Sequence, residues 1–184
     1  AELYLGDCRD VLPTIGAVDA VVTDPPYGIG ADASMAAGSG FQGGGMLAAK
    51  LEYRATDWDS QPIADDLIAA IIAKSPSAIV FGGNYYALPA TSCWLVWDKE
   101  VNGHFADCEL AWTNLPKAVR RIRYMWNGML RANGEQRGDH PTQKPIGVMK
   151  WCIGHLPATA ETILDPFMGS GTTGVAAVQM GRKF

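Results

Sequence analysis

Cysteine pairs, metal-ligand patterns and long apolar runs are all missing from this sequence, and each absence excludes a class of protein. The four cysteines form no C-x-x-C pair and the three histidines show no ligand spacing, so neither a zinc site nor a redox motif is indicated. We therefore expect no bound metal, and we expect reduced cysteines that are mostly buried.

A membrane span and a signal peptide are not indicated either. No apolar segment approaches the roughly twenty residues that a membrane-spanning helix needs. The opening residues, AELYLGDCRD, lack the basic and then apolar pattern of a signal peptide. At 184 residues and 48% hydrophobic, the chain is long enough for one domain with a sizeable core. These features predict a single cytoplasmic domain, 1–184, that does not bind a membrane.

The net charge of −4 is small, but it conceals an uneven distribution along the chain. Between Leu115 and Lys150 there are eight basic and two acidic residues, so this part carries +6 and the remainder −10. A basic segment on an acidic body can contact a polyanion locally. On charge alone, a solvated loop is an equally good interpretation.

Alternating apolar and β-branched residues predict short buried strands. They cover residues 2–6, 19–24, 77–83, 93–99, 108–114 and 161–167. A helix is predicted over 62–74, with Pro62 in its first turn, and a second over 172–181, closed by Gly181. Strands that alternate with helices favour an α/β domain with a mostly parallel sheet flanked by helices.

Two segments do not fit this pattern of strands and helices. Residues 28–61 contain seven glycines and are far longer than a usual connection of about four to six residues. The basic segment 115–139 places Tyr124 and Trp126 among arginines. Both are predicted to be insertions on a compact core, the first being either a mobile functional loop or a disordered one.

Near the end of the sequence, Gly169, Gly171 and Gly174 form a G-x-G-x-x-G pattern between a predicted strand and a predicted helix. In an α/β sheet such a turn allows a cofactor to approach the backbone beside a helix N-terminus. A tight strand-to-helix turn without a ligand is the alternative. A dinucleotide would also need an acidic residue about twenty positions further on, which would fall beyond Phe184.

The sequence Asp24-Pro25-Pro26-Tyr27 also follows a predicted strand, so we expect it at the same sheet edge as the glycine turn. The two prolines restrict the backbone and thereby fix the directions of the Asp24 carboxylate and of the carbonyl groups. Two acceptors beside an aromatic ring suit a planar heterocycle that carries an amino group. A rigid turn with a capping acid is the alternative interpretation.

In combination, these motifs resemble the amino-group DNA methyltransferases, which use S-adenosylmethionine. The sequence TDPPYG (23–28) looks like the catalytic motif of this family, and DPFMGSGTTGVAA (165–177) looks like its cofactor motif. HPTQKP (140–145) is similar to the segment that precedes the cofactor motif, and LYLGDCRDVL (3–12) resembles the opening of the catalytic half. The resemblance implies a Rossmann-like S-adenosylmethionine-dependent methyltransferase fold. Because the catalytic motif comes first, the order resembles the circularly permuted beta class.

The resemblance also implies roles for individual residues. Asp24, Pro25, Pro26 and Tyr27 would hold the extruded base, and Asp24 would also border the cofactor. The methionine side of the cofactor pocket would be formed by Asp165, Phe167, Met168, Gly169, Ser170, Gly171 and Thr172. Asp7 and Cys8 would lie near the adenine of the cofactor, and His140, Thr142 and Lys144 near its amino-acid end. Target-recognition residues would lie in 115–139, and 28–61 would be a mobile loop beside the DNA cleft.

The implied reaction is direct methyl transfer to the 6-amino group of an adenine that is flipped out of DNA. N4-methylation of cytosine stays open, although an aspartate at position 24 resembles the adenine-modifying members. Protein glutamine methylation, nicotinamide-dependent dehydrogenation and a non-catalytic DNA-binding or regulatory role are rival functions. The implied partner is DNA, a homodimer is possible, and a restriction partner is unknown. In the family, a further strand with a ribose-binding acid would follow Phe184.

Overall fold

The computed structural model of the chain describes residues 1–30, 59–100, 106–126 and 143–184. Several predictions from the sequence fall on other residues. Residues 31–58 of the glycine-rich segment, residues 127–139 of the basic segment, and His140 and Thr142 lie outside the described residues.

Short helices and strands alternate along the described residues. In chain order they are α1 (Cys8–Val11), η1 (Leu12–Thr14), β1 (Ala20–Thr23), α3 (Asp65–Ile72), β2 (Ser77–Phe81), η2 (Gly83–Tyr85), β3 (Trp94–Asp98), β4 (Cys108–Thr113), β5 (Arg120–Arg123), α4 (Ile146–Ile153), β6 (Ile163–Leu164) and α5 (Thr172–Gln179). No helix in these parts of the chain has the length and apolar character that crossing a bilayer requires.

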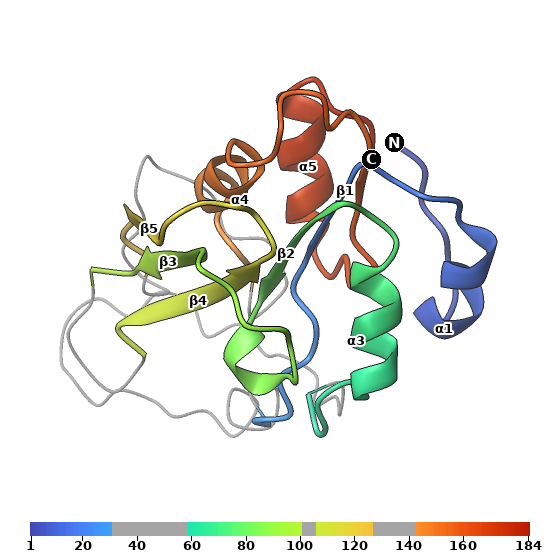
Figure 1. Cartoon of the computed structure of the whole chain (residues 1–184), viewed down its shortest axis with the longest axis horizontal. Coiled ribbons are helices and arrows are strands. Elements are labelled where there is room, and N and C mark those ends of the chain that lie inside the picture. Colours follow the sequence, from blue (N-terminus) through green and yellow to red (C-terminus); the bar gives the residue numbers. More distant parts are fainter. Residues whose placement is uncertain (31–58, 101–105, 127–142) are drawn as a thin grey trace, which may run out of the picture.

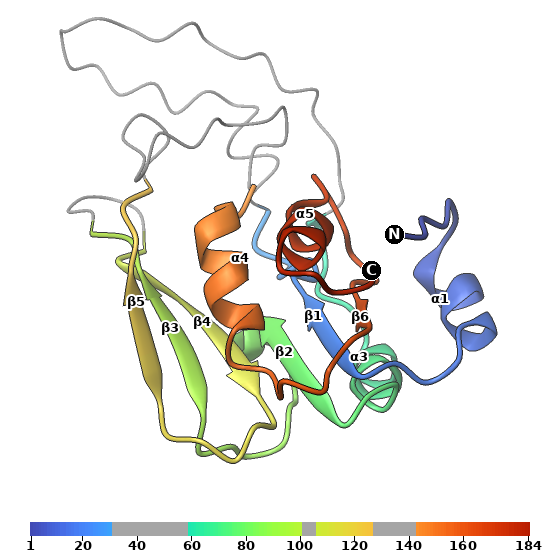
Figure 2. The ribbon, with the colours of Figure 1, turned by 90° about the horizontal axis from the view of Figure 1, so that it is seen from above.

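The strands of the described residues form one six-stranded sheet in the order β5-β3-β4-β2-β1-β6. β1 pairs in parallel with both β2 and β6, and β3 pairs in parallel with β5. β4 runs antiparallel to its two neighbours, β2 and β3. The sheet is therefore mixed. The parallel neighbours β1 and β6 lead into the Asp-Pro-Pro-Tyr sequence and the glycine turn, respectively. Figure 2 shows the six strands side by side in this order.

Helices cover both faces of the sheet. Successive side chains of a strand point to opposite sides, so one strand contributes to the core on each face. Ala20 and Val22 of β1 belong to the core that packs against α4 and α5. Val21, between them, belongs to the core that packs against α3. Figure 1 shows α4 and α5 on one side of the strands and α3 on the other. The result is an α/β arrangement of three layers.

Most of the predicted strands are present, but the prediction of the N-terminal one was wrong. Residues 2–6 are exposed and form no strand in the structure. Alternating apolar residues need an aligned partner strand, whereas the backbone of this segment meets the rest of the chain through a bond from Glu2 N–H to the Phe184 carbonyl, 2.7 Å. Burial was also overestimated for this segment, since Leu5 is fully exposed.

The predicted helices are present with shorter bounds, and five elements of the described residues were not predicted. Pro62 was expected in the first turn of α3, but the helix begins at Asp65, where two acidic residues favour its N-terminus. Gly181 closes α5 with a left-handed φ of 74°. The helix α4, the strand β5 and the short elements α1, η1 and η2 were missed. The strand β5 contains a single apolar residue, Ile122, so it shows no apolar alternation.

Candidate active site

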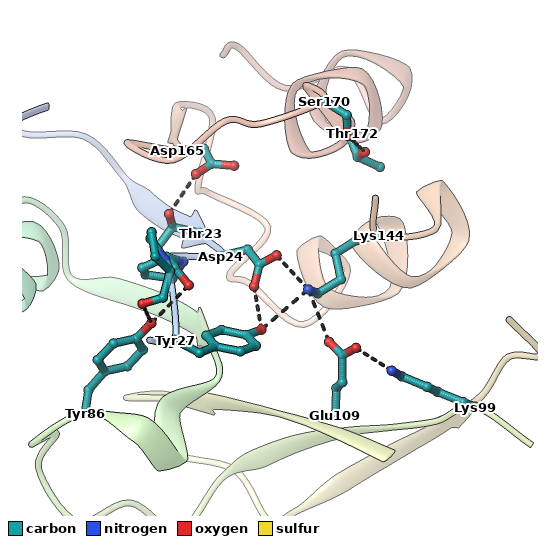
Figure 3. A network of polar contacts seen from close by, with 12 residues as sticks. Thr23, Asp24, Tyr27, Tyr86, Lys99, Glu109, Lys144, Asp165, Ser170 and Thr172 are labelled. Atoms are coloured by element: carbon teal, nitrogen blue, oxygen red, sulfur yellow. Dashed lines mark hydrogen bonds and ion pairs between the residues drawn. The ribbon is translucent and has the colours of Figure 1, made fainter. Parts of the chain in front are cut away.

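Asp24 follows the carboxyl end of β1, and donors from two other parts of the structure hold both of its carboxylate oxygens. The Tyr27 hydroxyl donates a hydrogen bond of 2.6 Å to Oδ1. The Lys144 ammonium donates one of 2.6 Å to Oδ2. Figure 3 shows Asp24 between these two donors, with Lys144 arriving from the segment just before α4. The plane of the carboxylate is therefore fixed from both sides.

The two prolines of this corner are held by Tyr86, which follows η2. The Tyr86 hydroxyl lies 3.0 Å from the Pro25 carbonyl oxygen and 2.8 Å from that of Pro26, and it can donate to either (Figure 3). Burial and the nearby Asp24 carboxylate raise the pKa of Tyr86 well above its ordinary value, so the hydroxyl remains a donor. Tyr86, which was not predicted to belong to the site, thus holds the Asp-Pro-Pro-Tyr corner in place.

The Tyr27 ring, expected to stack on a base, stacks within the protein on Tyr85. The ring centroids are 5.0 Å apart with an interplanar angle of 12°. Gly82 lies against the Tyr27 ring, where a Cβ atom would approach one ring carbon to 2.1 Å. Burial and the Asp24 carboxylate raise the pKa of Tyr27 well above its usual range. Tyr85 is 46% exposed, so the stack continues to the surface.

A chain of alternating charges extends from Asp24 into the sheet. Lys144 Nζ lies 3.2 Å from Glu109 Oε2, and Lys99 Nζ lies 2.6 Å from Glu109 Oε1. Burial would lower the pKa of Lys144, but the carboxylates of Asp24 and Glu109 outweigh it and raise that pKa above its ordinary value. Burial would raise the pKa of Glu109, but the two lysines lower it. Lys144 and Glu109 are therefore both charged at neutral pH.

The glycine turn follows β6 and is anchored by Asp165. The Asp165 carboxylate accepts hydrogen bonds from the Thr23 hydroxyl, 2.7 Å, and the Phe167 backbone N–H, 3.0 Å. Burial raises its pKa to about 6 against the opposing effect of these hydrogen bonds. Gly169 and Gly171 adopt left-handed φ angles of 51° and 76°, and α5 begins immediately afterwards.

The Thr23–Asp165 hydrogen bond connects the two motifs directly. Thr23 is the last residue of β1 and precedes Asp24, while Asp165 follows β6. Since β1 and β6 are adjacent and parallel, their carboxyl ends meet at one edge of the sheet. The prediction that both motifs share one sheet edge is confirmed.

A cavity of about 390 Å³ lies beside the cofactor motif. Four of its lining residues are Cys8, Asp165, Pro166 and Met168, of which three were predicted to face a cofactor. Asp7 serves as the N-cap of α1, where its carboxylate accepts a hydrogen bond of 2.8 Å from the Arg9 backbone N–H. Lys144 was predicted near the amino-acid end of a cofactor, and its ammonium lies against Asp24 and Glu109.

Comparison with known proteins finds similarity to DNA methyltransferases. The family model described as DNA methylase, for N6 and N4 amino methyltransferases, matches residues 95–184. A type II methyltransferase, M2.LlaDCHI of Lactococcus lactis subsp. cremoris, is 47% identical over 68 residues, which are 35% of this chain and 24% of that protein. The second half of this chain is therefore similar to amino-group DNA methyltransferases.

Two further proteins of known description are similar to this chain. The DNA adenine methyltransferase YhdJ of Escherichia coli K12 is 39% identical over 64 residues, 35% of this chain and 19% of that protein. Each of these two alignments thus spans less than a quarter of the curated relative. The crystal structure of an M1.HpyAVI–SAM complex has a TM-score of 0.56 and 21% identity, covering 98% of this chain and 90% of that one. The last comparison establishes the methyltransferase fold.

Four polar residues of the site were missed by sequence reasoning. They are Tyr85, Tyr86, Lys99 and Glu109. The two tyrosines follow β2, whose carboxyl end lies beside that of β1. The rule that residues after neighbouring parallel strands meet at one sheet edge could therefore have indicated them. Glu109 is the only acid in a mostly apolar strand, and this pattern in the sequence indicates a buried carboxylate with a charged partner.

Proposed function

We propose that this chain transfers a methyl group from S-adenosylmethionine to the exocyclic 6-amino group of adenine in DNA. The observation that carries the proposal is the hydrogen bond between Thr23 and Asp165, which joins the Asp-Pro-Pro-Tyr corner to the glycine turn. An acceptor for an amino group and a turn suited to a cofactor therefore lie next to each other. The match of residues 95–184 to the DNA methylase family model and the adenine methyltransferase among the relatives support the same reaction.

The residues at the glycine turn fit S-adenosylmethionine. A Cβ atom built on Gly171 would meet nothing within 4 Å, so the backbone of the turn is open to a ligand. Asp165 and Met168 border the adjacent cavity, together with Cys8. The residues that would hold the cofactor are Cys8, Asp165, Phe167, Met168, Gly169, Ser170, Gly171 and Thr172. When bound, this cofactor supplies an electrophilic methyl group on a sulfonium.

Asp24 would orient the amino group of the substrate base. Each carboxylate oxygen accepts more than one hydrogen bond, so the contacts of Asp24 with Tyr27 and Lys144 leave acceptor capacity for an N–H of the base. The Pro25 carbonyl likewise has a second lone pair beside its contact with Tyr86. Both acceptors would stabilise the positive charge that develops on nitrogen as the N–C bond forms and the sulfonium S–C bond breaks, and the nitrogen would then lose one proton to solvent. A base must leave the duplex to reach this corner.

Adenine is favoured over cytosine by two observations. The residue that opens the corner is Asp24, as in the adenine-modifying members that the motif resembles. One of the relatives is described as a DNA adenine methyltransferase. Because both bases carry an exocyclic amino group, N4-methylation of cytosine is the second candidate, and nucleoside analysis of the product distinguishes them.

The proposed function is tested by incubating unmethylated DNA with S-adenosylmethionine and the protein, digesting the DNA, and measuring methylated nucleosides by mass spectrometry. We expect N6-methyladenine with the wild type and a loss of at least about 100-fold with Asp24→Ala, since the acceptor for the amino group is gone. Asp10→Ala, at an exposed position of α1, is the matched control and should retain activity. Near-normal turnover by Asp24→Ala would refute the assigned role.

A non-catalytic DNA-binding relative is the rival from a different class. Isothermal titration of the protein with S-adenosylmethionine separates the two hypotheses, because the rival requires no cofactor. If Asp24→Ala still bound S-adenosylmethionine but no longer transferred methyl groups, Asp24 would be needed for the methyl-transfer step and not for cofactor binding. Absence of both cofactor binding and methylated product would leave the binding-module interpretation in place of the enzyme.

A further inference from the structure

Glu109 places a negative charge inside an apolar strand of the sheet. It is the second residue of β4, and its side chain is 21% exposed. Its two carboxylate oxygens contact two different lysines, Lys99 at 2.6 Å and Lys144 at 3.2 Å. Figure 3 shows Glu109 below the Lys144 ammonium, on the side away from the Asp165 turn.

Lys144 is a buried cation that depends on its anionic neighbours. The residue is 8% exposed, and its ammonium contacts the carboxylates of Asp24 and Glu109. Removing one partner from a buried ion pair leaves an uncompensated charge that the surrounding structure must relax to accommodate. The position of Lys144 beside Asp24 therefore depends on Glu109 as well as on Asp24 itself.

We propose that Glu109 is a positioning residue: together with Lys99, it holds the Lys144 ammonium against the Asp24 carboxylate and so fixes the direction in which Asp24 accepts a hydrogen bond from the substrate. The inference rests on the proposed function of Asp24. It assigns roles to Glu109 and Lys99, which lie outside both motifs, and it gives Lys144 a role at the catalytic corner.

Charge balance gives Glu109 a second consequence for the reaction. The chain Lys99, Glu109, Lys144 and Asp24 contains two cations and two anions, so its formal charge is zero. During transfer the substrate nitrogen becomes positive near Asp24, and a lone ammonium at Lys144 would repel it. Glu109 offsets that repulsion while Lys144 continues to orient Asp24.

Glu109→Gln tests the proposal kinetically, because it removes the charge and keeps the shape of the side chain. We expect kcat to fall at least about 10-fold with little change in the KM for S-adenosylmethionine. Glu161→Gln is the matched control, since its carboxylate forms an exposed ion pair with Lys183. In a Lys144→Met background, Glu109→Gln should add little further loss, because Glu109 acts through Lys144. Additive losses, or an unchanged kcat in folded Glu109→Gln, would overturn the inference.

A spectroscopic measurement reads the ion pairs without any turnover. Nitrogen-15 spectra of lysine side chains should show a hydrogen-bonded Lys144 ammonium in the wild type that exchanges slowly with water. That signal should shift or broaden in Glu109→Gln and in Asp24→Asn, and stay unchanged in Glu161→Gln. A Lys144 signal that is unaffected by Glu109→Gln would overturn the positioning role.

Lys99→Gln keeps the test decisive if Glu109→Gln fails to fold. This variant leaves the Glu109–Lys144 pair in place but removes the second contact of Glu109. It should give an intermediate loss of kcat and an intermediate change in the Lys144 signal. A wild-type kcat and a wild-type Lys144 signal in Lys99→Gln would overturn the proposed role of the Lys99–Glu109 ion pair. A wild type that transfers no methyl group would instead refute the proposed function, and the positioning role would fall with it.

Discussion

Gly82 determines where the Tyr27 ring can lie, and hence how its hydroxyl meets Asp24. The glycine has a φ of 64°, and a Cβ atom there would approach a Tyr27 ring carbon to 2.1 Å. Gly82→Ala should therefore cost about 1–2 kcal/mol of stability from the left-handed backbone alone, and more from displacement of the ring. It should also lower methyl transfer. Thermal unfolding and the methylation assay measure the two effects.

Gly16→Ala is the matched control for that substitution. A Cβ atom at Gly16 would meet nothing within 4 Å, and no left-handed φ is involved. Stability and activity should stay near those of the wild type. If Gly82→Ala behaved like Gly16→Ala, the Tyr27 ring would not be confined as the structure indicates.

At the scale of single residues, the sequence predicted partners within one motif, and it predicted that the two motifs meet, but it did not predict the individual contacts between distant side chains. Asp24 and Tyr27 lie three positions apart, so one motif contains both partners of their hydrogen bond. Lys144 contacts Asp24 across 120 positions, and no spacing rule connects them. Their pairing follows from the order of the strands and from the start of α4, which only the fold supplies.

The edge strand β5 presents its arginines to solvent and provides a test of DNA contact. Arg121 and Arg123 lie near Asp98 at 3.8 and 3.7 Å, with side chains 58% and 62% exposed. If these side chains neutralise phosphates, changing both to glutamine should weaken DNA binding. The slope of log affinity against log salt should become shallower by about 1–2, since each phosphate contact contributes about 0.9.

Fluorescence anisotropy with a labelled duplex at several salt concentrations measures this slope. Lys183→Gln, also an exposed cation but located beside β6 at the other edge of the sheet, is the control and should leave the slope unchanged. Identical slopes for the wild type and the double arginine variant would exclude β5 from the DNA-contacting surface.

At the scale of elements, apolar alternation predicted strands wherever a neighbouring strand exists to pair with them. The five predicted strands after residue 6 all have counterparts in the sheet. Residues 2–6 have the same pattern and remain exposed, because pairing is a property of the whole sheet and not of the segment. The direction of β4 was likewise not predictable, since its antiparallel pairing depends on where the chain re-enters the sheet between β2 and β3.

The stability of the whole molecule should depend on pH through Asp165. Burial raises the pKa of this carboxyl from an ordinary value of 3.8 to about 6, so the folded state favours the protonated form. The corresponding stability is present below the unfolded-state pKa and is lost as pH rises through about 6. The loss should amount to about 3 kcal/mol, since one pKa unit corresponds to about 1.4 kcal/mol.

Urea unfolding at several pH values, compared between the wild type and Asp165→Asn, isolates this contribution. The asparagine cannot ionise, so the wild type should lose stability relative to the variant as pH rises from about 4 to about 7. Parallel stability curves for the two proteins would show that Asp165 does not titrate with a raised pKa in the folded state.

In the molecule as a whole, residues from distant parts of the chain form a site at the end of one interior strand, β1. All four residues of β1 are completely buried, and the strand lies between two parallel partners. Backbone groups in such a strand exchange with water only when much of the domain opens, an event with the free energy of global unfolding. Asp24 directly continues this strand. Its orientation should therefore persist for as long as the molecule stays folded, so that successive DNA encounters meet the same arrangement over many turnovers.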